Sequence, residues 1–320
     1  MILKILSKFP FIFNVLKKVK HLFLSLVSSK YRNKLYLITQ ISKYLPEVNV
    51  IDVGASYFPH AKFQIFLNSI KTNWYAIDPN VENLSYINNW KHNAKVYKIP
   101  NALSSGGGNQ VLYKTKIDSG SSTLKFNLSD NLNHRIVKSN LFPITELQIN
   151  TISFQQFIND NCNKELNFIM KLDTQGTEFD IVSSVEKQIF QNLICVEIEN
   201  TISIEPININ SSKISDVINF FHSIDFEIVQ VDVVDYLYPK TSNKLLNRNV
   251  PKECDWIFMK KSSSILKSDL NFKLLSLGCY ISYNLMGEAL HLIQNILEEN
   301  TLEITINLKR TLLKIKGLIS

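Results

Sequence analysis

The sequence has 320 residues, of which 45% are hydrophobic, and a formal net charge of +7 at pH 7. This length is enough for one large domain or two modest ones around a full hydrophobic core. The positive charge is spread along the chain instead of gathering in blocks of Lys and Arg, which argues against a nucleic-acid-binding protein, although a basic surface would also suit an anionic glycan or a membrane face.

The four cysteines, Cys162, Cys195, Cys254 and Cys279, are far apart in the chain, and none forms a C-x-x-C pair. We therefore expect reduced thiols in a cytoplasmic protein. No His, Asp and Glu residues have the spacing of a metal-ligand set, so no metal is expected.

Residues 1–30 carry apolar side chains at helical spacing, with lysines beside them. The lysines interrupt this stripe too often for a spanning helix, which needs roughly 20 apolar residues, and no small-residue cleavage site follows, as a secretory signal would require. The segment would either lie on an anionic bilayer through residues 1–28 or pack on the rest of the protein. A further helix is predicted from Tyr31 to Leu45, so residues 1–45 are interpreted as an N-terminal helical segment.

Two short apolar runs, NVIDVGAS at 49–56 and NWYAIDPN at 73–80, are predicted as buried strands. Between them Phe63, Phe66, Leu67 and Ile70 recur at helical spacing, which makes a strand-helix-strand unit. Ligands of such units bind at the carboxyl ends of the parallel strands. Asp52 and Asp78 both fall on that edge, where a carboxylate can accept from two ribose hydroxyls, so we expect a nucleoside-containing cofactor.

The glycines indicate which cofactor. A dinucleotide needs a G-x-G-x-x-G turn for its pyrophosphate, and here only Gly54 is present. S-adenosylmethionine carries no phosphate and needs only one close approach of the backbone. The alternative is that Gly54 merely turns the chain and Asp78 caps a helix.

The following residues predict a helix near 82–92, a third strand ending near Asn101, and an extra strand or hairpin after Gly106 to Gly108. No Lys-Ser pair follows these glycines, so they are not interpreted as a phosphate loop. The polar stretch 118–143 is either a lid or a disordered segment.

A strand and a short helix capped by Thr151 or Ser153 are predicted next. Then come a fourth strand, a turn through Asp173 to Gly176, a helix starting near Thr177, a fifth strand at 193–200, a helix at 212–224 and two closing strands. This order indicates an α/β fold with a class I methyltransferase-like (Rossmann-like) sheet, mostly parallel with one antiparallel strand, over residues 46–262. Residues 263–320 are predicted as a helical extension that packs on the main domain or on a second chain in a homo-oligomer.

Several of these motifs together resemble the FkbM-type S-adenosylmethionine-dependent methyltransferases: DVGAS, AIDP, NALS, KLDTQGTE and CDWIFMK, over roughly residues 48–260. The most specific is Lys171 to Glu178. The family has these motifs in the same order and with similar spacing. It often has Asn at the position of Ser56, Gly at that of Phe58 and Glu at that of Asp78. Asp for Glu keeps the carboxylate, whereas the bulky Phe58 stands where backbone would approach the methionine tail.

The resemblance implies O-methylation of a sugar, glycan or small-molecule hydroxyl, with S-adenosylmethionine as cofactor. It places Gly54, Ala55 and Asp52 against the methionyl portion, with Ser56 in the same site. It also places Asp78 at the ribose, and Asn101 and Ala102 by the adenine.

A hydroxyl is a poor nucleophile until its proton leaves, so a general base is expected. The candidates are Asp173, which ends the strand facing the methyl group, Glu178, and His134 in the predicted lid. Each has a structural alternative: Asp173 as a turn cap, Glu178 at a helix N-terminus and His134 as a solvated loop residue.

Two other classes of function are the alternatives to this enzyme. A binding or scaffolding protein could keep the fold without the cofactor, which Phe58 and the helical tail would both fit. A nicotinamide enzyme is disfavoured by the missing glycines.

Overall fold

The computed structural model of the protein describes residues 36–56, 59–116, 118–127, 142–202, 208–237, 250–299 and 304–319. Four sequence predictions lie wholly or largely outside these residues: the amphipathic segment 1–28, the effect of Phe58, the polar stretch 118–143 as a lid or disordered segment, and the role of His134 within it. No helix in the described ranges is long and apolar enough to cross a bilayer.

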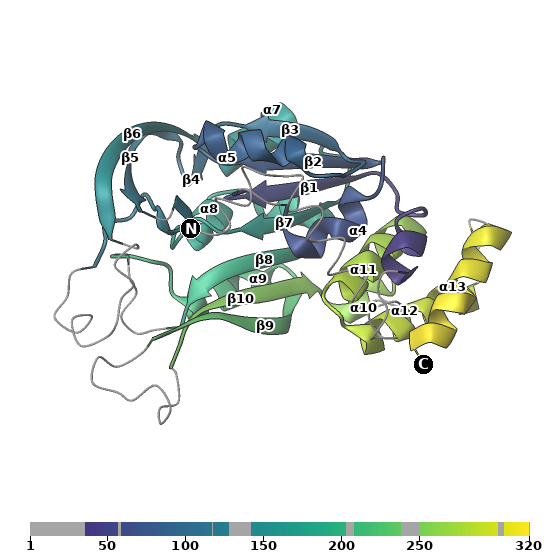
Figure 1. Ribbon diagram of the computed structural model, residues 1–320. Helices are drawn as coiled ribbons and strands as arrows, with labels where there is room; N and C mark the ends of the chain where they lie inside the picture. Colours follow the sequence, from purple (N-terminus) through teal and green to yellow (C-terminus); the bar gives the residue numbers. More distant parts are fainter. Residues whose placement is uncertain are drawn as a thin grey trace, which may run out of the picture.

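A seven-stranded sheet forms the centre of the fold, in the order β3-β2-β1-β7-β8-β10-β9 (Figure 1). Its strands are β1 (Val48–Val53), β2 (Thr72–Ile77), β3 (Lys95–Ile99), β7 (Phe168–Leu172), β8 (Leu193–Thr201), β9 (Phe226–Leu237) and β10 (Val250–Lys260). Strands β3, β2, β1, β7 and β8 pair in parallel, while β10 is antiparallel to both β8 and β9. The predicted α/β methyltransferase-like sheet with one antiparallel strand is confirmed.

Helices cover both faces of this sheet, so its central strands are buried on both sides. All six residues of β1 are buried, as expected for a parallel strand with continuous apolar sequence. One face packs on η1 (Ala61–Phe63), α4 (Gln64–Leu67), α5 (Val81–Tyr86), η2 (Ile87–Asn89) and the helical residues 36–41. The other packs on α7 (Phe154–Asn161), α8 (Glu178–Ser183), η5 (Lys187–Asn192) and α9 (Ile214–Ser223).

A second, three-stranded sheet, in the order β4-β6-β5, lies beside one end of the main sheet (Figure 1). It consists of β4 (Ala102–Ser104), β5 (Gly108–Thr115) and β6 (Pro143–Ser153), and η3 (Asp118–Gly120) follows β5. The extra strand expected after the glycines is therefore present. The predicted third strand is divided, because Pro100 cannot donate to a β-ladder and the chain changes sheets there.

A side-chain cap begins α7, as the sequence predicts. Ser153 Oγ accepts from the Gln156 amide at 3.0 Å at the start of α7. The predicted helix between the first two strands is shorter than expected, since α4 ends at Leu67 and Ile70 is 80% exposed in the turn before β2. The inclusion of Ile70 in this helix was wrong.

The C-terminal residues form α10 (Ser262–Ile265), α11 (Leu270–Ser282), α12 (Met286–Glu299) and α13 (Ile306–Ile319), at the opposite end from β4, β5 and β6 (Figure 1). Helix α11 is buried along most of its length and shares a hydrophobic core with α4 and β8. A Cβ added to Gly278 would lie 3.0 Å from Phe66 Cζ. Of the two surfaces left open by the sequence, α11 therefore uses the main domain, while the homo-oligomer and the domain limits at residues 45 and 262 stay predictions.

Candidate active site

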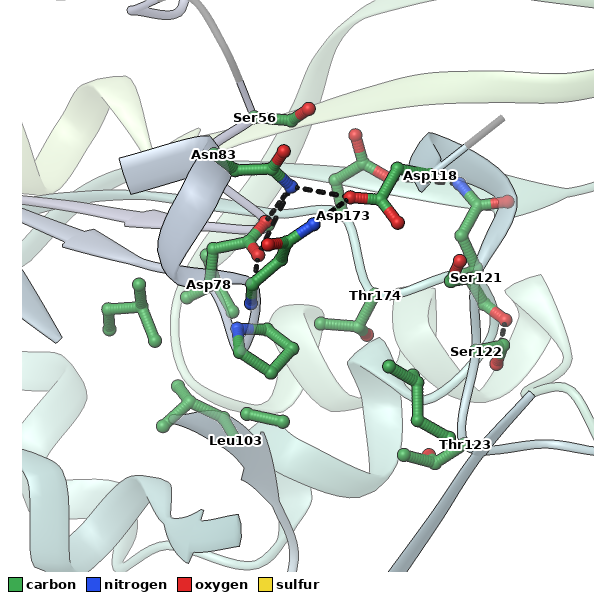
Figure 2. A pocket seen from close by; sticks show the side chains of 18 of the residues that line it. Ser56, Asp78, Asn83, Leu103, Asp118, Ser121, Ser122, Thr123, Asp173 and Thr174 are labelled. Carbon is green, nitrogen blue, oxygen red and sulfur yellow. Dashed lines mark hydrogen bonds between the residues drawn. The ribbon is translucent and has the colours of Figure 1, made fainter. Parts of the chain in front are cut away.

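A cavity opens at the carboxyl ends of β1, β2 and β7, between the main sheet and the smaller one (Figure 2). Its empty volume is about 770 Å³, with the open solvent at its mouth included. Asp78, Asp118 and Asp173 are its carboxylates. The apolar part of its lining is Val53, Ile77, Pro79, Ala102, Leu103 and Leu112.

Gly54 joins two sides of this cavity. Its φ is +78°, and its amide donates to the Ile77 carbonyl at 2.9 Å. A Cβ at this position would lie 2.2 Å from the Asp173 carbonyl oxygen. Only glycine therefore allows the ends of β1 and β7 to approach so closely.

Asp78 follows the last residue of β2 and faces the cavity. Its Oδ1 accepts from the Asn80 amide at 2.7 Å, and Asn83 Nδ2 lies 3.3 Å from both of its oxygens. Burial raises the pKa of Asp78 to about 7. The bonds from Asn80 and Asn83 oppose this shift, whereas the negative charge of Asp118 adds to it.

Asp118 comes from η3, forty residues further along the chain, and was not predicted as a site residue. Its Oδ2 accepts from Asn83 Nδ2 at 3.0 Å and also from Asn80 Nδ2. Figure 2 shows Asn83 between the two carboxylates, Asp78 and Asp118. The only sequence signal was that Asp118 begins the polar stretch interpreted as a lid or a disordered segment.

Asp173 begins the turn after β7. Lys171 Nζ donates to its Oδ2 at 2.8 Å, and Gln175 Nε2 donates to its Oδ1 at 2.9 Å. Burial alone would raise the pKa of Asp173, but the Lys171 ammonium and a hydrogen bond from Glu199 hold it below its ordinary value. The carboxylate is therefore ionised with both oxygens occupied.

The residues after Asp173 are held in an unusual backbone conformation. Gln175 and Gly176 have φ values of 60° and 114°. The Gln175 carbonyl accepts from Ser122 Oγ at 2.9 Å and from Asn208 Nδ2 at 2.8 Å. Segments far apart in sequence thus hold this turn at the cavity wall.

Glu178 stabilises the same turn through hydrogen bonds from its backbone amides. It is fully buried, and its carboxylate accepts from the amides of Thr174, at 2.7 Å, and Gly176, at 3.0 and 3.1 Å. Burial raises the pKa of Glu178 to about 7, against the lowering effect of these amides. Glu178 does not line the cavity, so its observed contacts are those of a positioning residue.

A comparison with protein families shows to which family the chain belongs. The model of the methyltransferase FkbM domain matches residues 52–228, more than half of the sequence. The chain belongs to the FkbM methyltransferase family. A comparison with curated proteins found no match.

In this FkbM methyltransferase, Asp52 lies in a row of ionisable side chains across the sheet. Lys171 is its register partner on β7, and Glu197 is the next on β8. His60 Nε2 lies 3.1 Å from Glu197 Oε1. Burial raises the pKa of Asp52, while the charges of Lys171 and His60 oppose that shift.

The predicted site residues of the methyltransferase therefore fall into three groups. The cavity lining contains Gly54, Ser56, Asp78, Asn101, Ala102 and Asp173. Asp52, Ala55 and Glu178 lie outside it: Asp52 because its side chain alternates with that of Val53, and Ala55 because it packs in the core. No contact with the cavity supports the cofactor role predicted for Asp52 and Ala55. His134 forms the third group, outside the described residues.

Among the described residues no group of three or more His, Cys, Asp and Glu side chains is arranged to hold a metal.

Proposed function

We propose that this FkbM methyltransferase uses S-adenosylmethionine to methylate a hydroxyl oxygen of a sugar, glycan or small-molecule acceptor. The observation that carries the proposal is the cavity lining, which combines three carboxylates with no Lys, Arg or His side chain among its described residues. Lys114 and Lys171 pair with Asp118 and Asp173 from outside that lining.

This lining suits a cation better than a phosphate. S-adenosylmethionine carries a sulfonium and no phosphate, whereas a nicotinamide dinucleotide carries a negatively charged pyrophosphate that needs amide or cationic donors. Carboxylates beside the cavity would attract the sulfonium and repel the pyrophosphate.

The residues that would hold the cofactor follow from their places in the cavity. Asp78 would accept from the ribose hydroxyls, with Asn101 near the adenine. The apolar side chains of Ile77 and Leu103 would cover the flat faces of the base. Gly54 and Ser56 would lie along the methionyl portion.

When bound, the cofactor supplies a methyl group on sulfur: the acceptor oxygen forms the new O–C bond, the C–S bond breaks with its electron pair going to sulfur, and the hydroxyl proton goes to a base. The chain offers the ionised Asp173 for that proton. Burial and the charge of Asp173 raise the pKa of Glu199 well above its ordinary value, so Glu199 keeps its own proton and donates to Asp173, which leaves Asp173 as the base. Most of the remaining catalysis would come from alignment of the reacting atoms.

Isothermal titration of the full chain tests the proposal. We expect heat on titration with S-adenosylmethionine, competition by S-adenosylhomocysteine and no response to a nicotinamide dinucleotide. The absence of heat with both adenosyl compounds would contradict the proposal and favour a cofactor-free binding protein with this fold.

A further inference from the structure

Both ends of the chain lack acidic residues. Residues 1–46 contain nine Lys and Arg and no Asp or Glu, and residues 304–320 contain four Lys and Arg and again no acid. The basic residues form no long run, because apolar residues separate them. The two ends therefore carry local positive charge that the interior of the sequence does not.

These two ends meet in the structure. Thr311 Oγ1 of α13 donates to Tyr44 Oη at 3.3 Å, and Leu45 and Leu308 belong to one hydrophobic core. Figure 1 shows residues 36–41, in purple, near α13, in yellow, at the end of the molecule away from β4, β5 and β6. The cofactor cavity lies beside that smaller sheet, so the basic end and the cavity are at opposite ends of the molecule.

Helix α13 has apolar side chains on two of its sides. One side is buried against the rest of the protein and consists of Leu308, Leu312 and Ile315. On another side, Ile306 and Leu313 are 72% and 51% exposed, and they lie on one stripe because seven residues make two helical turns. A Cβ added to Gly317, four residues further on, would meet no atom of the described residues within 4 Å. This second apolar stripe is therefore open.

Cations flank the open stripe. Successive residues of an α-helix are about 100° apart, which places Arg310 and Lys314 on one side of Leu313 and Lys309 and Lys316 on the other. Arg310 and Lys314 are both exposed. An apolar stripe between cations is the pattern of a helix that lies on an anionic bilayer, with its apolar side chains at the acyl boundary and its cations at the lipid phosphates.

Two occupants from the protein itself are disfavoured by charge. A second copy that packed α13 on α13 in an isologous dimer would place cations against the same cations. The eight exposed residues of α13 are also far fewer than the roughly 20–30 on each side of a stable protein interface. The chain's own residues 1–30 carry six lysines and no acid, so they would be repelled in the same way.

The acids at this end of the molecule lie on the neighbouring helix α12. Glu288, Glu298 and Glu299 are exposed there, and Glu299 pairs with Lys273. These carboxylates would repel an anionic bilayer that α13 attracts. The contact would therefore run along α13, the outermost helix in Figure 1, and would leave the cofactor cavity at the other end open to solvent.

We propose that the exposed face of α13 is a docking surface for an anionic lipid bilayer. Ile306 and Leu313 enter the headgroup region, while Arg310 and Lys314 lie at the lipid phosphates. This inference goes beyond the proposed methyl transfer and does not depend on a bound cofactor.

Sedimentation of the full chain with lipid vesicles tests the proposal. Vesicles of equal parts phosphatidylglycerol and phosphatidylcholine are compared with vesicles of phosphatidylcholine alone. Each is measured at low and at raised salt, because salt screens exposed charges. Sedimentation velocity without vesicles reports separately on self-association.

Two double variants divide the surface into its charge and its apolar stripe. One carries Arg310→Gln and Lys314→Gln, and the other carries Ile306→Ser and Leu313→Ser. All four side chains are exposed, so both variants should fold, and thermal unfolding checks this.

Matched controls carry the same kinds of change elsewhere. Lys187→Gln with Lys213→Gln removes two exposed charges at η5 and before α9, on the other face of the sheet. Ile144→Ser with Val234→Ser removes two apolar side chains that are 64% and 50% exposed.

We expect the parent to sediment with the anionic vesicles, and less at raised salt, but hardly with phosphatidylcholine alone. The charge variant should partition about 10–30-fold more weakly, because each cation near an anionic surface contributes about 1 kcal/mol, or about fivefold. The apolar variant should lose about tenfold, and the controls should match the parent.

Three results would overturn the proposal. The first is equal sedimentation with neutral and anionic vesicles, or none with either. The second is undiminished sedimentation of both α13 variants, which would place the contact elsewhere in the chain. The third is self-association of the parent that the α13 variants abolish, which would make this face an interface with a second copy.

Discussion

Asp52 and Asp78 occupy similar places in the sequence and very different places in the molecule. Each stands near the carboxyl end of a buried strand, Asp52 at that of β1 and Asp78 at that of β2. Asp78 lies one residue beyond its strand and lines the cavity, whereas Asp52 lies inside β1 and belongs to the buried row with Lys171 and Glu197. Asp52 is in register with Ala76, so Asp78 stands two positions further along, beyond the last residue of β2 and at the cavity.

This difference separates the roles of the two acids. Asp78 has partners that a ligand hydroxyl could replace or join, and burial leaves its pKa near 7. Asp52 has an Oδ2 without a hydrogen-bond partner among the described residues, and the nearby ammonium belongs to Lys171. We therefore expect Asp78 to act in binding and Asp52 to matter for the charge balance of the core.

The largest expected effect is a loss of stability when the row of ionisable side chains around Asp52 loses its lysine. Lys171→Met leaves several carboxylates of this region without their cation, and removing one partner of a buried charge pair typically costs about 3–5 kcal/mol. Chemical denaturation should show this loss in the free energy of unfolding. Lys164→Met, at an exposed position, is the control and should change it by less than about 0.5 kcal/mol. A loss below about 1 kcal/mol in Lys171→Met would show that the row does not depend on its lysine.

The next effect compares the two acids directly. Asp78→Asn should weaken binding of S-adenosylhomocysteine by about 10–100-fold, because an amide cannot accept from both ribose hydroxyls as a carboxylate does. Asp52→Asn, a change of the same size in the neighbouring strand, should alter that affinity by less than about threefold. Titration calorimetry measures both. Equal losses in the two variants would mean that Asp52 also reaches the cofactor and that the distinction fails.

The smallest effect is a dependence on pH. The pKa of Asp78 is raised to about 7 in the free protein, and binding of a cation with ribose donors favours its ionised form. Affinity for S-adenosylmethionine should therefore fall as the pH drops through 7, by at most about tenfold between pH 8 and pH 6. The same titration of Asp78→Asn should be flat over this range. An affinity that rises toward low pH would contradict the assignment.

Much of the sheet could be predicted because each strand carries its own signal. The runs at 49–56 and 73–80, the turn from Asp173 to Gly176 and the antiparallel closing pair all follow from local apolar patterns and turn residues. The family motifs lie in the same segments, so the cavity residues Gly54, Asp78 and Asp173 were identified from sequence.

Other features depend on contacts between distant segments. Asp118 comes close to Asp78, with Asn83 donating to both, only because the second sheet folds over the strand ends. Whether an acid near a strand end reaches the cavity depends on where that strand ends, and strand boundaries are the least predictable part of a sequence pattern. Helix α11 was predicted only as part of a C-terminal extension, because apolar residues all around a helix do not indicate which surface covers it.

A crystal structure of the full chain grown with S-adenosylhomocysteine would test the central claim most directly. We predict density for the nucleoside in the cavity between the two sheets, with both ribose hydroxyls within hydrogen-bond distance of the Asp78 carboxylate and the sulfur on the side of Asp173. A nucleoside bound elsewhere, or a ribose whose hydroxyls do not reach Asp78, would contradict the account.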